Sequence, residues 1–299
     1  MLTAVILTYN ESLHIERCIS SIKDACSRIC IVDSYSTDST CEIARSLGAE
    51  VFQNKWENNY ARQMNWAFQN CGISTPWVLR MDADEYFLPE LLAEVKSRLP
   101  QLSSNIGGIQ LTRRVVFKGT WLRHGGFYPI HLLRIFRPEW GHCEQRLMDE
   151  HIVLSQGKVI QFKNDIVDEN LNPIHWWVTK HNNYAIREAT DIINRKYHLF
   201  DRENMSDSVT ISQVSKKRFA KEMIYNNLPL GVRPTLYFIY RFCFQLGILD
   251  GPKGWLFHFM QGFWYRLLVD ANVMEFEAAN RTTTPIQKLN YLERALKCH

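Results

Sequence analysis

Blocks of apolar and polar residues alternate along the first ninety positions and predict strands and helices in turn. Short apolar runs at residues 2–7, 29–32 and 77–81 have the length of buried strands, and residues 51–52 form a shorter one. Between these runs, apolar residues recur at helical spacing over residues 15–22, 43–47 and 59–69. Gly48 is expected at the C′ position that ends the second helix. This alternation predicts an α/β fold with a mostly parallel sheet and helices on both faces.

Three of the predicted strands end in polar segments, at residues 8–11, 33–38 and 82–85. The carboxyl ends of neighbouring parallel strands meet at one edge of a sheet, where α/β proteins bind ligands. We therefore expect the three segments to converge. Asp38 precedes a predicted helix, and we interpret it as a capping or turn residue.

The segment from Trp77 to Glu85 places two carboxylates, Asp82 and Asp84, directly after a buried strand. An unpaired carboxylate is costly to remove from water, so this ending needs an explanation. Oxygen ligands suit Mg²⁺ or Mn²⁺, and Mg²⁺ commonly shares one or two carboxylates with substrate phosphates. The pattern favours a metal–diphosphate site, although an isolated Asp-x-Asp is also compatible with a solvated turn.

Together these segments resemble the nucleotide-sugar-binding half of family-2 glycosyltransferases with the GT-A fold. The matching motifs are Thr8-Tyr-Asn-Glu11, Asp33-Ser-Tyr-Ser-Thr-Asp-Ser-Thr40, Asn59-Tyr-Ala-Arg-Gln-Met-Asn65 and Met81-Asp-Ala-Asp-Glu85. Further along, Trp121-Leu-Arg-His-Gly-Gly-Phe-Tyr-Pro129 and Leu133-Arg-Ile-Phe-Arg137 are similar to a bacterial branch that builds lipopolysaccharide core and exopolysaccharide. Tyr35 departs from the family, which usually has glycine there, and is expected to narrow the loop around the base.

The resemblance implies a role for each matching residue. Thr8, Tyr9 and Glu11 would line the uridine or ribose pocket, and Asp33 would accept a hydrogen bond from the base. Arg62 would lie near the base and diphosphate, although a solvated helix arginine is the alternative. Asp82 would lie near the ribose and the metal, and Asp84 would be the direct ligand of Mn²⁺ or Mg²⁺.

Sugar transfer also needs a base, because a carboxylate or histidine must remove the proton of the acceptor hydroxyl. One base and one metal suffice for a single displacement with inversion, the outcome that the resemblance implies. The resemblance favours Glu150, just before the apolar run 152–154, with Asp149 as the competitor. Adjacent strand residues point to opposite faces, so only one of the two can reach the substrate. The alternative is that both are surface carboxylates paired with Arg146.

Two histidines are secondary candidates. His124 lies in a Gly-Gly loop that can approach the substrate, so we count it with the nucleotide-sugar-binding residues. His175 opens a predicted helix over residues 176–193 and matches a histidine of the related branch, where it would approach the metal or the diphosphate. A structural hydrogen bond is the commoner role for an isolated histidine.

The last third of the chain is basic and aromatic. Residues 211–245 hold six Lys or Arg and one acidic residue, so their local net charge of +5 exceeds the net charge of +4 of the whole chain. Basic residues beside Trp, Tyr and Phe are typical of a helix in a membrane interface. The alternatives are a helical hairpin packed on the catalytic domain or a contact in a homo-oligomer. No nucleic-acid-binding motif accompanies these residues. We expect a GT-A domain at 1–200, with halves at 1–100 and 101–200, and a membrane-associating helical extension at 201–299.

Composition sets the remaining expectations. Eight cysteines show neither a Cys-x-x-Cys pair nor zinc spacing, and no signal peptide precedes the first strand, so a cytoplasmic location is expected. No apolar run reaches the roughly 18 residues of a spanning helix, which leaves peripheral association with the inner membrane.

The predicted activity is metal-dependent, inverting transfer of a sugar from a nucleoside diphosphate to a glycan or lipid-linked glycan of the bacterial surface, and UDP is the nucleotide we expect. A nucleotidyltransferase is the enzymatic rival, but the first loop lacks the Gly-rich, Lys-containing phosphate loop it would need. A non-catalytic scaffold that binds sugar nucleotides at the membrane is the other rival.

Overall fold

The computed structural model describes the chain except for residues 145–150, 200–224, 226, 281–283, 285–286 and 289–299. The chain divides into two compact units. The first comprises residues 1–123 and 127–171, and the second comprises residues 124–126 and 172–299. The boundary differs from the expected one at residue 200 because the long helix after residue 173 packs with the C-terminal helices.

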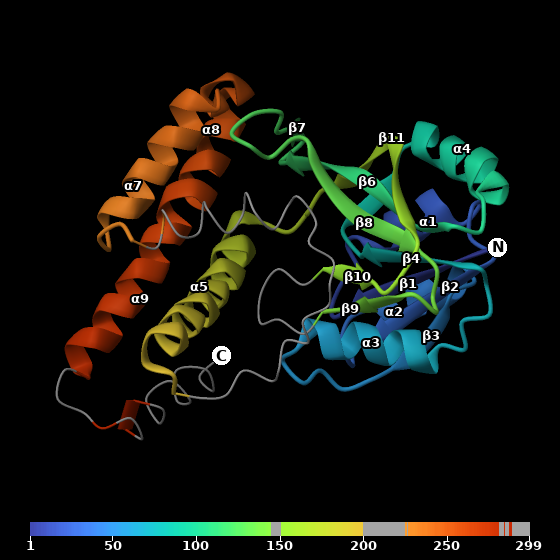
Figure 1. The fold of residues 1–299 in the computed structure, drawn as a ribbon, viewed down its shortest axis with the longest axis horizontal. Coiled ribbons are helices and arrows are strands. Elements are labelled where there is room, and N and C mark those ends of the chain that lie inside the picture. The colour runs from blue at the N-terminus through green and yellow to red at the C-terminus, as the bar shows by residue number, and fades with distance from the viewer. Residues whose placement is uncertain (145–150, 200–224, 226, 281–283, 285–286, 289–299) are drawn as a thin grey trace. The chain divides into compact units, whose positions relative to one another are not determined.

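The first unit contains strands and helices in alternation, followed by a region made mainly of strands (Figure 1). In chain order its elements are β1 (Leu2–Thr8), α1 (Ile15–Ile22), β2 (Arg28–Asp33), α2 (Thr40–Ser46), β3 (Glu50–Gln53), α3 (Tyr60–Asn70), β4 (Trp77–Asp82), β5 (Glu85–Phe87), α4 (Pro89–Arg98), β6 (Ile106–Phe117), β7 (Thr120–Trp121), β8 (Ile130–Phe136), β9 (Gly141–Cys143), β10 (Ile152–Leu154) and β11 (Lys158–Asp168). The strands and helices predicted for the first ninety residues are confirmed, with Gly48 at φ +86° after α2.

The main sheet has the strand order β3-β2-β1-β4-β8-β6-β11-β5, with β7 paired to β6. β1 lies between β2 and β4 in parallel register, so that Thr8 is opposite Asp33 and Leu7 is opposite Asp82. The polar ends of these three strands therefore lie side by side, as the pattern predicted. A separate two-stranded sheet joins β9 and β10.

The expectation of a mostly parallel sheet is wrong for the second half of this unit. Within the described residues, four pairings of the main sheet are parallel and four are antiparallel. β8 runs antiparallel to both of its neighbours, and β5 runs antiparallel to β11. Strands that reverse direction in this way need no crossover helix, so local strand–helix alternation could not reveal them.

Apolar side chains cover both faces of the main sheet. On one face, Ile15, Ile19 and Ile22 of α1 pack with buried residues of α2 and α4. On the other face, Met64 of α3 packs with Phe136 and with the small sheet. Helices on both faces fix the direction of the strands, and the polar loops are left at the sheet edge.

The second unit is helical in its described part. Its elements are α5 (Ile174–Tyr197), α7 (Val232–Ile239), a π-helical turn (Tyr240–Phe244), a short 3₁₀ turn (Gly247–Asp250), α8 (Gly251–Phe259), a second π-helical turn (Met260–Trp264) and α9 (Tyr265–Ala279). α5 and α9 lie side by side and bury Ala189 and Ile193 against Val269 and Phe276 (Figure 1). No helix among the described residues is long and apolar enough to cross a membrane.

Candidate functional site

The ends of β1 and β2 are joined through the carboxylate of Asp33. This side chain is fully buried, and it accepts hydrogen bonds from the Thr8 hydroxyl at 3.0 Å and from the Ser36 hydroxyl at 2.5 Å. The backbone N–H of Ser36 donates to its other oxygen at 2.8 Å. These donors offset the cost of burying the carboxylate, and they fix the start of the loop that follows β2.

The loops after β1 and β2 are tied together by side chains. The Asn10 side chain accepts from the Thr37 N–H at 2.8 Å, and Asp38 accepts from the N–H groups of Ser12 and Thr40 at 3.1 and 3.0 Å. Asp38 therefore acts in the turn before α2, as predicted. Burial alone would raise its pKa, but hydrogen bonds from Thr40 and Ser12 outweigh this and lower it.

Two tyrosines project from these loops. Tyr9 is 59% exposed and Tyr35 is 54% exposed. Tyr35 also has a φ of +62°, a left-handed backbone conformation that favours glycine. This observation explains why a glycine is usual at this position. A non-glycine residue held there stores strain, which is common beside ligand sites.

Glu11 is held by a buried histidine. His14 is fully buried, its Nδ1 lies 2.6 Å from Glu11 Oε2, and its Nε2 accepts the Leu171 N–H at 2.9 Å. Because Nε2 is an acceptor, Nδ1 carries the proton and donates to Glu11. The histidine thus orients Glu11 and connects the first loop to the chain segment after β11. Sequence reasoning assigned no role to His14.

The Asp82 carboxylate contacts two arginines and a tyrosine hydroxyl. Its Oδ1 accepts from the Tyr60 hydroxyl at 2.8 Å and from Arg80 at 3.2 Å, and its Oδ2 contacts Arg134 at 3.3 Å. Burial raises the pKa of Tyr60 well above its usual value, so the hydroxyl keeps its proton and donates. Both oxygens of Asp82 therefore already have partners supplied by α3, β4 and β8.

Arg134 also forms a buried ion pair with Glu85. Both side chains are 1% exposed, and Glu85 additionally accepts the Asp82 N–H at 3.0 Å. The Nε and Nη1 groups of Arg134 have no partner within the described structure. This pair lies directly beneath the Asp82–Asp84 turn. The sequence signal for it is an arginine inside the apolar run of β8, which was noted as part of a motif but not assigned to the site.

Asp84 lies in the turn between β4 and β5 and, like Asp82, is only partly buried. Its carboxylate accepts from the Asn170 side chain at 3.0 Å, and its carbonyl accepts the Glu169 N–H at 3.1 Å. Arg17 pairs with Glu169 at 2.8 Å. The segment after β11 therefore positions the turn that presents Asp84.

The donor set at this edge fits a hard divalent cation, since it offers carboxylate oxygens. No cluster of three or more His, Cys, Asp or Glu side chains arranged for a metal occurs in the described part of the chain. Asp84 and Asp82 thus fit part of a cation site, which other ligands would have to complete. They do not form a closed protein cage.

Three of the other predicted residues lie in described segments, and two do not. Arg62 is exposed on α3, 3.6 Å from Glu57. His124 belongs to the second unit, where its Nδ1 lies 2.6 Å from the buried carboxylate of Asp250. His175 is exposed in the first turn of α5, also in the second unit. Asp149 and Glu150 lie outside the described residues. The roles of these residues stay predictions.

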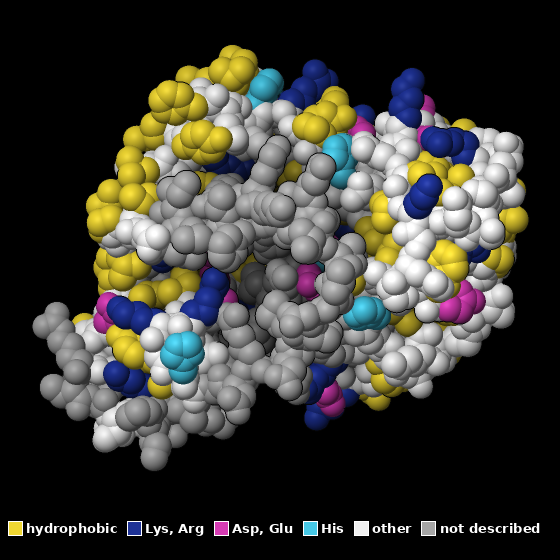
Figure 2. Space-filling model, in the orientation of Figure 1, with side chains coloured by type: hydrophobic (Ala, Val, Ile, Leu, Met, Phe, Trp, Pro, Cys, Tyr) yellow, Lys and Arg dark blue, Asp and Glu magenta, His cyan; other side chains and the backbone are white. Residues whose placement is uncertain are grey.

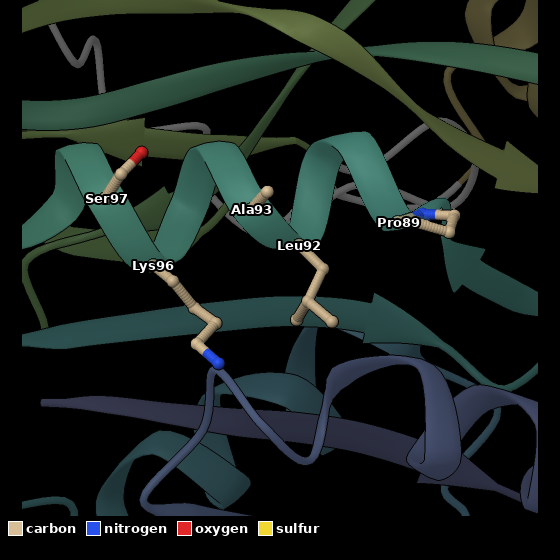
Figure 3. A pocket seen from close by; sticks show the side chains of 5 residues that line it. All are labelled: Pro89, Leu92, Ala93, Lys96 and Ser97. Carbon is tan, nitrogen blue, oxygen red and sulfur yellow. The ribbon is translucent and has the colours of Figure 1, made fainter.

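A shallow hollow on the outer side of α4 is lined by Pro89, Leu92, Ala93, Lys96 and Ser97 (Figure 3). Lys96 and Ser97 are its only polar side chains, and no carboxylate lines it. The hollow offers no set of groups for the chemistry that the strand ends suggest.

Comparison with known proteins gives a consistent pattern. The model of "Glycosyl transferase family 2" matches residues 3–149. An uncharacterized glycosyltransferase of Rickettsia bellii is 41% identical over 95 residues, which are 32% of this chain and 31% of that protein. The match thus spans about a third of that relative. The lipopolysaccharide core biosynthesis glycosyltransferase LpsC of Rhizobium meliloti is 28% identical over 201 residues, 63% of this chain and 70% of LpsC.

Two solved structures also align. Glucosyl-3-phosphoglycerate synthase from Mycobacterium tuberculosis, in complex with Mn²⁺, UDP and glucosyl-3-phosphoglycerate, has 21% identity and a TM-score of 0.31, with 38% of this chain and 44% of that chain covered. S. aureus TarS 1–349 has 14% identity and a TM-score of 0.43, with 94% of this chain and 91% of that chain covered.

Proposed function

We propose that the protein, whose residues 3–149 match the model of glycosyl transferase family 2, transfers a sugar from a nucleoside-diphosphate sugar to a hydroxyl of a bacterial surface glycan precursor. We choose UDP as the nucleotide of the donor. The reaction would depend on Mn²⁺ or Mg²⁺ and invert the anomeric carbon. One observation carries the proposal. Three polar strand ends meet at one sheet edge, and there Asp84 is held, partly buried, on an anchored turn.

The first two loops would hold the donor nucleoside. Their exposed rings, Tyr9 and Tyr35, offer apolar surfaces for a base, and Glu11 offers a carboxylate already oriented by His14. The Asp33 carboxylate would accept a hydrogen bond from the base in place of the one from the Ser36 hydroxyl. The hydrogen bond from Thr8 would keep the carboxylate in position. Arg62 would meet the diphosphate.

Asp84 would be the direct metal ligand, with Asp82 behind it. A bound divalent cation supplies Lewis-acid stabilisation of the charge on the departing diphosphate. Asn170 and the Arg17–Glu169 pair hold Asp84 for this task, and Arg80, Arg134 and Tyr60 hold Asp82. His175 would approach the metal or the diphosphate, and His124 the sugar nucleotide.

Glu150 remains our choice for the base that removes the acceptor proton, with Asp149 as the competitor. The acceptor would be a glycan or lipid-linked glycan for lipopolysaccharide, O-antigen, capsule or exopolysaccharide, and the name of the relative LpsC supports this class. With such acceptors, the reaction would take place on the cytoplasmic side of the inner membrane, and the protein would be bound there peripherally.

The test is a screen of sugar nucleotides for Mn²⁺- or Mg²⁺-dependent hydrolysis and transfer, repeated with excess chelator. Asp84→Asn should lower turnover by at least about 10²-fold, because the variant loses charge where the metal is held. Asp24→Asn, which changes an exposed carboxylate after α1, is the matched control and should keep full activity. Glu150→Gln should retain donor binding while turnover falls by about 10²-fold or more.

Undiminished transfer by Asp84→Asn would remove Asp84 from the mechanism. Release of pyrophosphate from a nucleoside triphosphate and a sugar phosphate would show nucleotidyl transfer and contradict the proposal. Donor binding without any turnover across acceptors and metals would favour a binding protein.

A further inference from the structure

The second unit exposes an unusual amount of apolar surface between residues 232 and 259. Phe244 is 76% exposed and Leu249 is 62% exposed, and other large apolar side chains around them are more than two-fifths exposed. Figure 2 shows hydrophobic side chains gathered over α7 and α8. We call this the α7–α8 surface; its principal side chains are Leu236, Ile239, Phe244, Leu249, Trp255 and Phe259.

These side chains project from helices whose opposite side is well packed. Leu236 and Ile239 lie on the outer face of α7, whereas Arg233 and Pro234 are buried. The ring of Phe238 stacks on Phe242 at 5.1 Å and contacts further aromatic rings of the unit. The exposed surface is therefore an ordered face of a folded unit, and a contiguous apolar face of this kind marks an interaction site.

The charge of the segment points to an anionic partner. Asp250 is the only acidic residue between residues 232 and 259. Its side chain is 1% exposed, and it lies 2.6 Å from His124 and 2.9 Å from His258. Lys253 is exposed, and Arg241 contacts the carbonyl of Gly125 and the Tyr237 hydroxyl. The sequence just upstream adds Lys216, Lys217, Arg218 and Lys221.

An apolar face in a segment, residues 232–259, that holds basic residues and no exposed acid complements a bilayer that contains anionic lipids. A second copy of the chain would instead bring like charges together. No helix among the described residues is long and apolar enough to cross the roughly 30 Å of a hydrocarbon core. The geometry thus suits a helical face that lies in the headgroup region and does not cross the membrane.

We propose that the α7–α8 surface inserts into the interface of an anionic lipid bilayer, with Phe244 and Leu249 among the most deeply inserted side chains. Trp255 and Tyr240 would lie at the headgroup level, as amphipathic rings do. This binding needs neither donor nor metal. It can therefore be tested separately from the transfer reaction.

The test is flotation of the full chain with vesicles of phosphatidylethanolamine and phosphatidylglycerol, compared with vesicles of phosphatidylcholine alone. The protein should bind the anionic vesicles more tightly, and added salt should weaken the binding in part. Phe244→Asp/Leu249→Asp should reduce partitioning at least about tenfold, because two apolar side chains are replaced by charges of the wrong sign.

Val159→Asp is the matched control, since Val159 is 44% exposed on β11 of the first unit. It should bind vesicles like the wild type. Circular dichroism melting should show that the double variant is folded, and a milder Leu249→Ser replaces it if it is not. Asp84→Asn should bind vesicles normally even when transfer is lost.

Unchanged vesicle binding by the folded double variant would overturn the proposal, as would equal binding to neutral and anionic vesicles. Concentration-dependent dimerisation in light scattering, abolished by the double variant without any vesicle binding by the wild type, would assign the surface to a second copy and equally overturn it.

Discussion

Replacing Arg134 by methionine tests whether the buried ion pair beneath the Asp82–Asp84 turn is required for the fold. Arg134 and Glu85 are each 1% exposed, so solvent cannot replace the lost partner. Breaking a buried pair on one side typically costs about 3–5 kcal/mol, because an uncompensated charge is left behind. Burial and the Asp82 charge raise the pKa of Glu85, so its carboxyl can take up a proton in the variant, which reduces this cost. Methionine keeps much of the apolar volume of the arginine stem.

Two features of the structure place the expected loss in the lower half of that range. The Nε and Nη1 groups of Arg134 have no partner in the described structure, and the variant removes their desolvation cost. Asp82 also keeps its bonds from Tyr60 and Arg80. We therefore expect Arg134→Met to lower the free energy of unfolding of the first unit by about 3 kcal/mol.

The buried carboxyl of Glu85 leads to a second, sharper prediction. Glu85→Gln keeps the acceptor for the Asp82 N–H but removes the buried charge. In the double variant Arg134→Met/Glu85→Gln no charge is left unpaired at this position. The double variant should therefore be more stable than Arg134→Met alone, by about 1.5 kcal/mol or more.

Because the chain has two units, one global melting curve does not isolate the change in stability of the first unit. Hydrogen exchange of peptides from β4 and β8 reports the first unit directly, and Arg45→Met, at an exposed site on α2, is the control. A loss below about 1 kcal/mol in Arg134→Met would refute the estimate. A double variant no more stable than Arg134→Met would refute the charge argument.

Three further predictions concern both units. Burial lowers the pKa of His181 to about 4. As the pH falls below about 6.5, this histidine takes up a proton in the unfolded chain before it does so in the folded one, and the free energy of unfolding of the second unit falls by up to about 3 kcal/mol by pH 4. His181→Phe should remove this part of the acid sensitivity, which melting at pH 7 and pH 4.5 would show. Asp270→Asn leaves the buried Arg233 without its anionic partner at 2.5 Å, and hydrogen exchange in α9 should show a loss of about 2 kcal/mol or more, whereas no loss would mean that the pair is dispensable. Tyr35→Gly removes the strain of a left-handed backbone but adds a similar entropic cost of ordering a glycine, so the free energy of unfolding should change by less than about 1 kcal/mol. The affinity for UDP, measured by calorimetry, should change. Unchanged affinity would exclude the Tyr35 ring from the donor site.

The elements of the first ninety residues could be predicted because their core-forming residues are local in sequence. Ile15, Ile19 and Ile22 repeat at helical spacing, and all three are fully buried. β1, β2 and β4 read as continuous apolar runs because helices cover both faces of the sheet at these strands. Strand geometry alone was then enough to predict that the polar ends of these strands lie side by side.

The second half of the first unit could not be predicted in the same way. β8 and β5 take their direction from partners that lie far away in sequence, and β5 has only three residues. The boundary between the two units could not be predicted from the sequence either. Nothing in the pattern of α5 indicates whether its apolar side packs on the sheet or on α9, and the structure shows that it packs on α9.

The two aspartates show the same division between local and distant information. The sequence presents Asp82 and Asp84 as equivalent oxygen donors one residue apart. The structure separates them, because Asp82 is bound by Arg80, Arg134 and a tyrosine, whereas Asp84 has a neutral amide donor from Asn170. A cation meets less repulsion beside Asp84, whose donor is a neutral amide, than beside Asp82, which already contacts two positively charged guanidinium groups. Metal dependence should therefore follow Asp84, and the stability of the turn should follow Asp82.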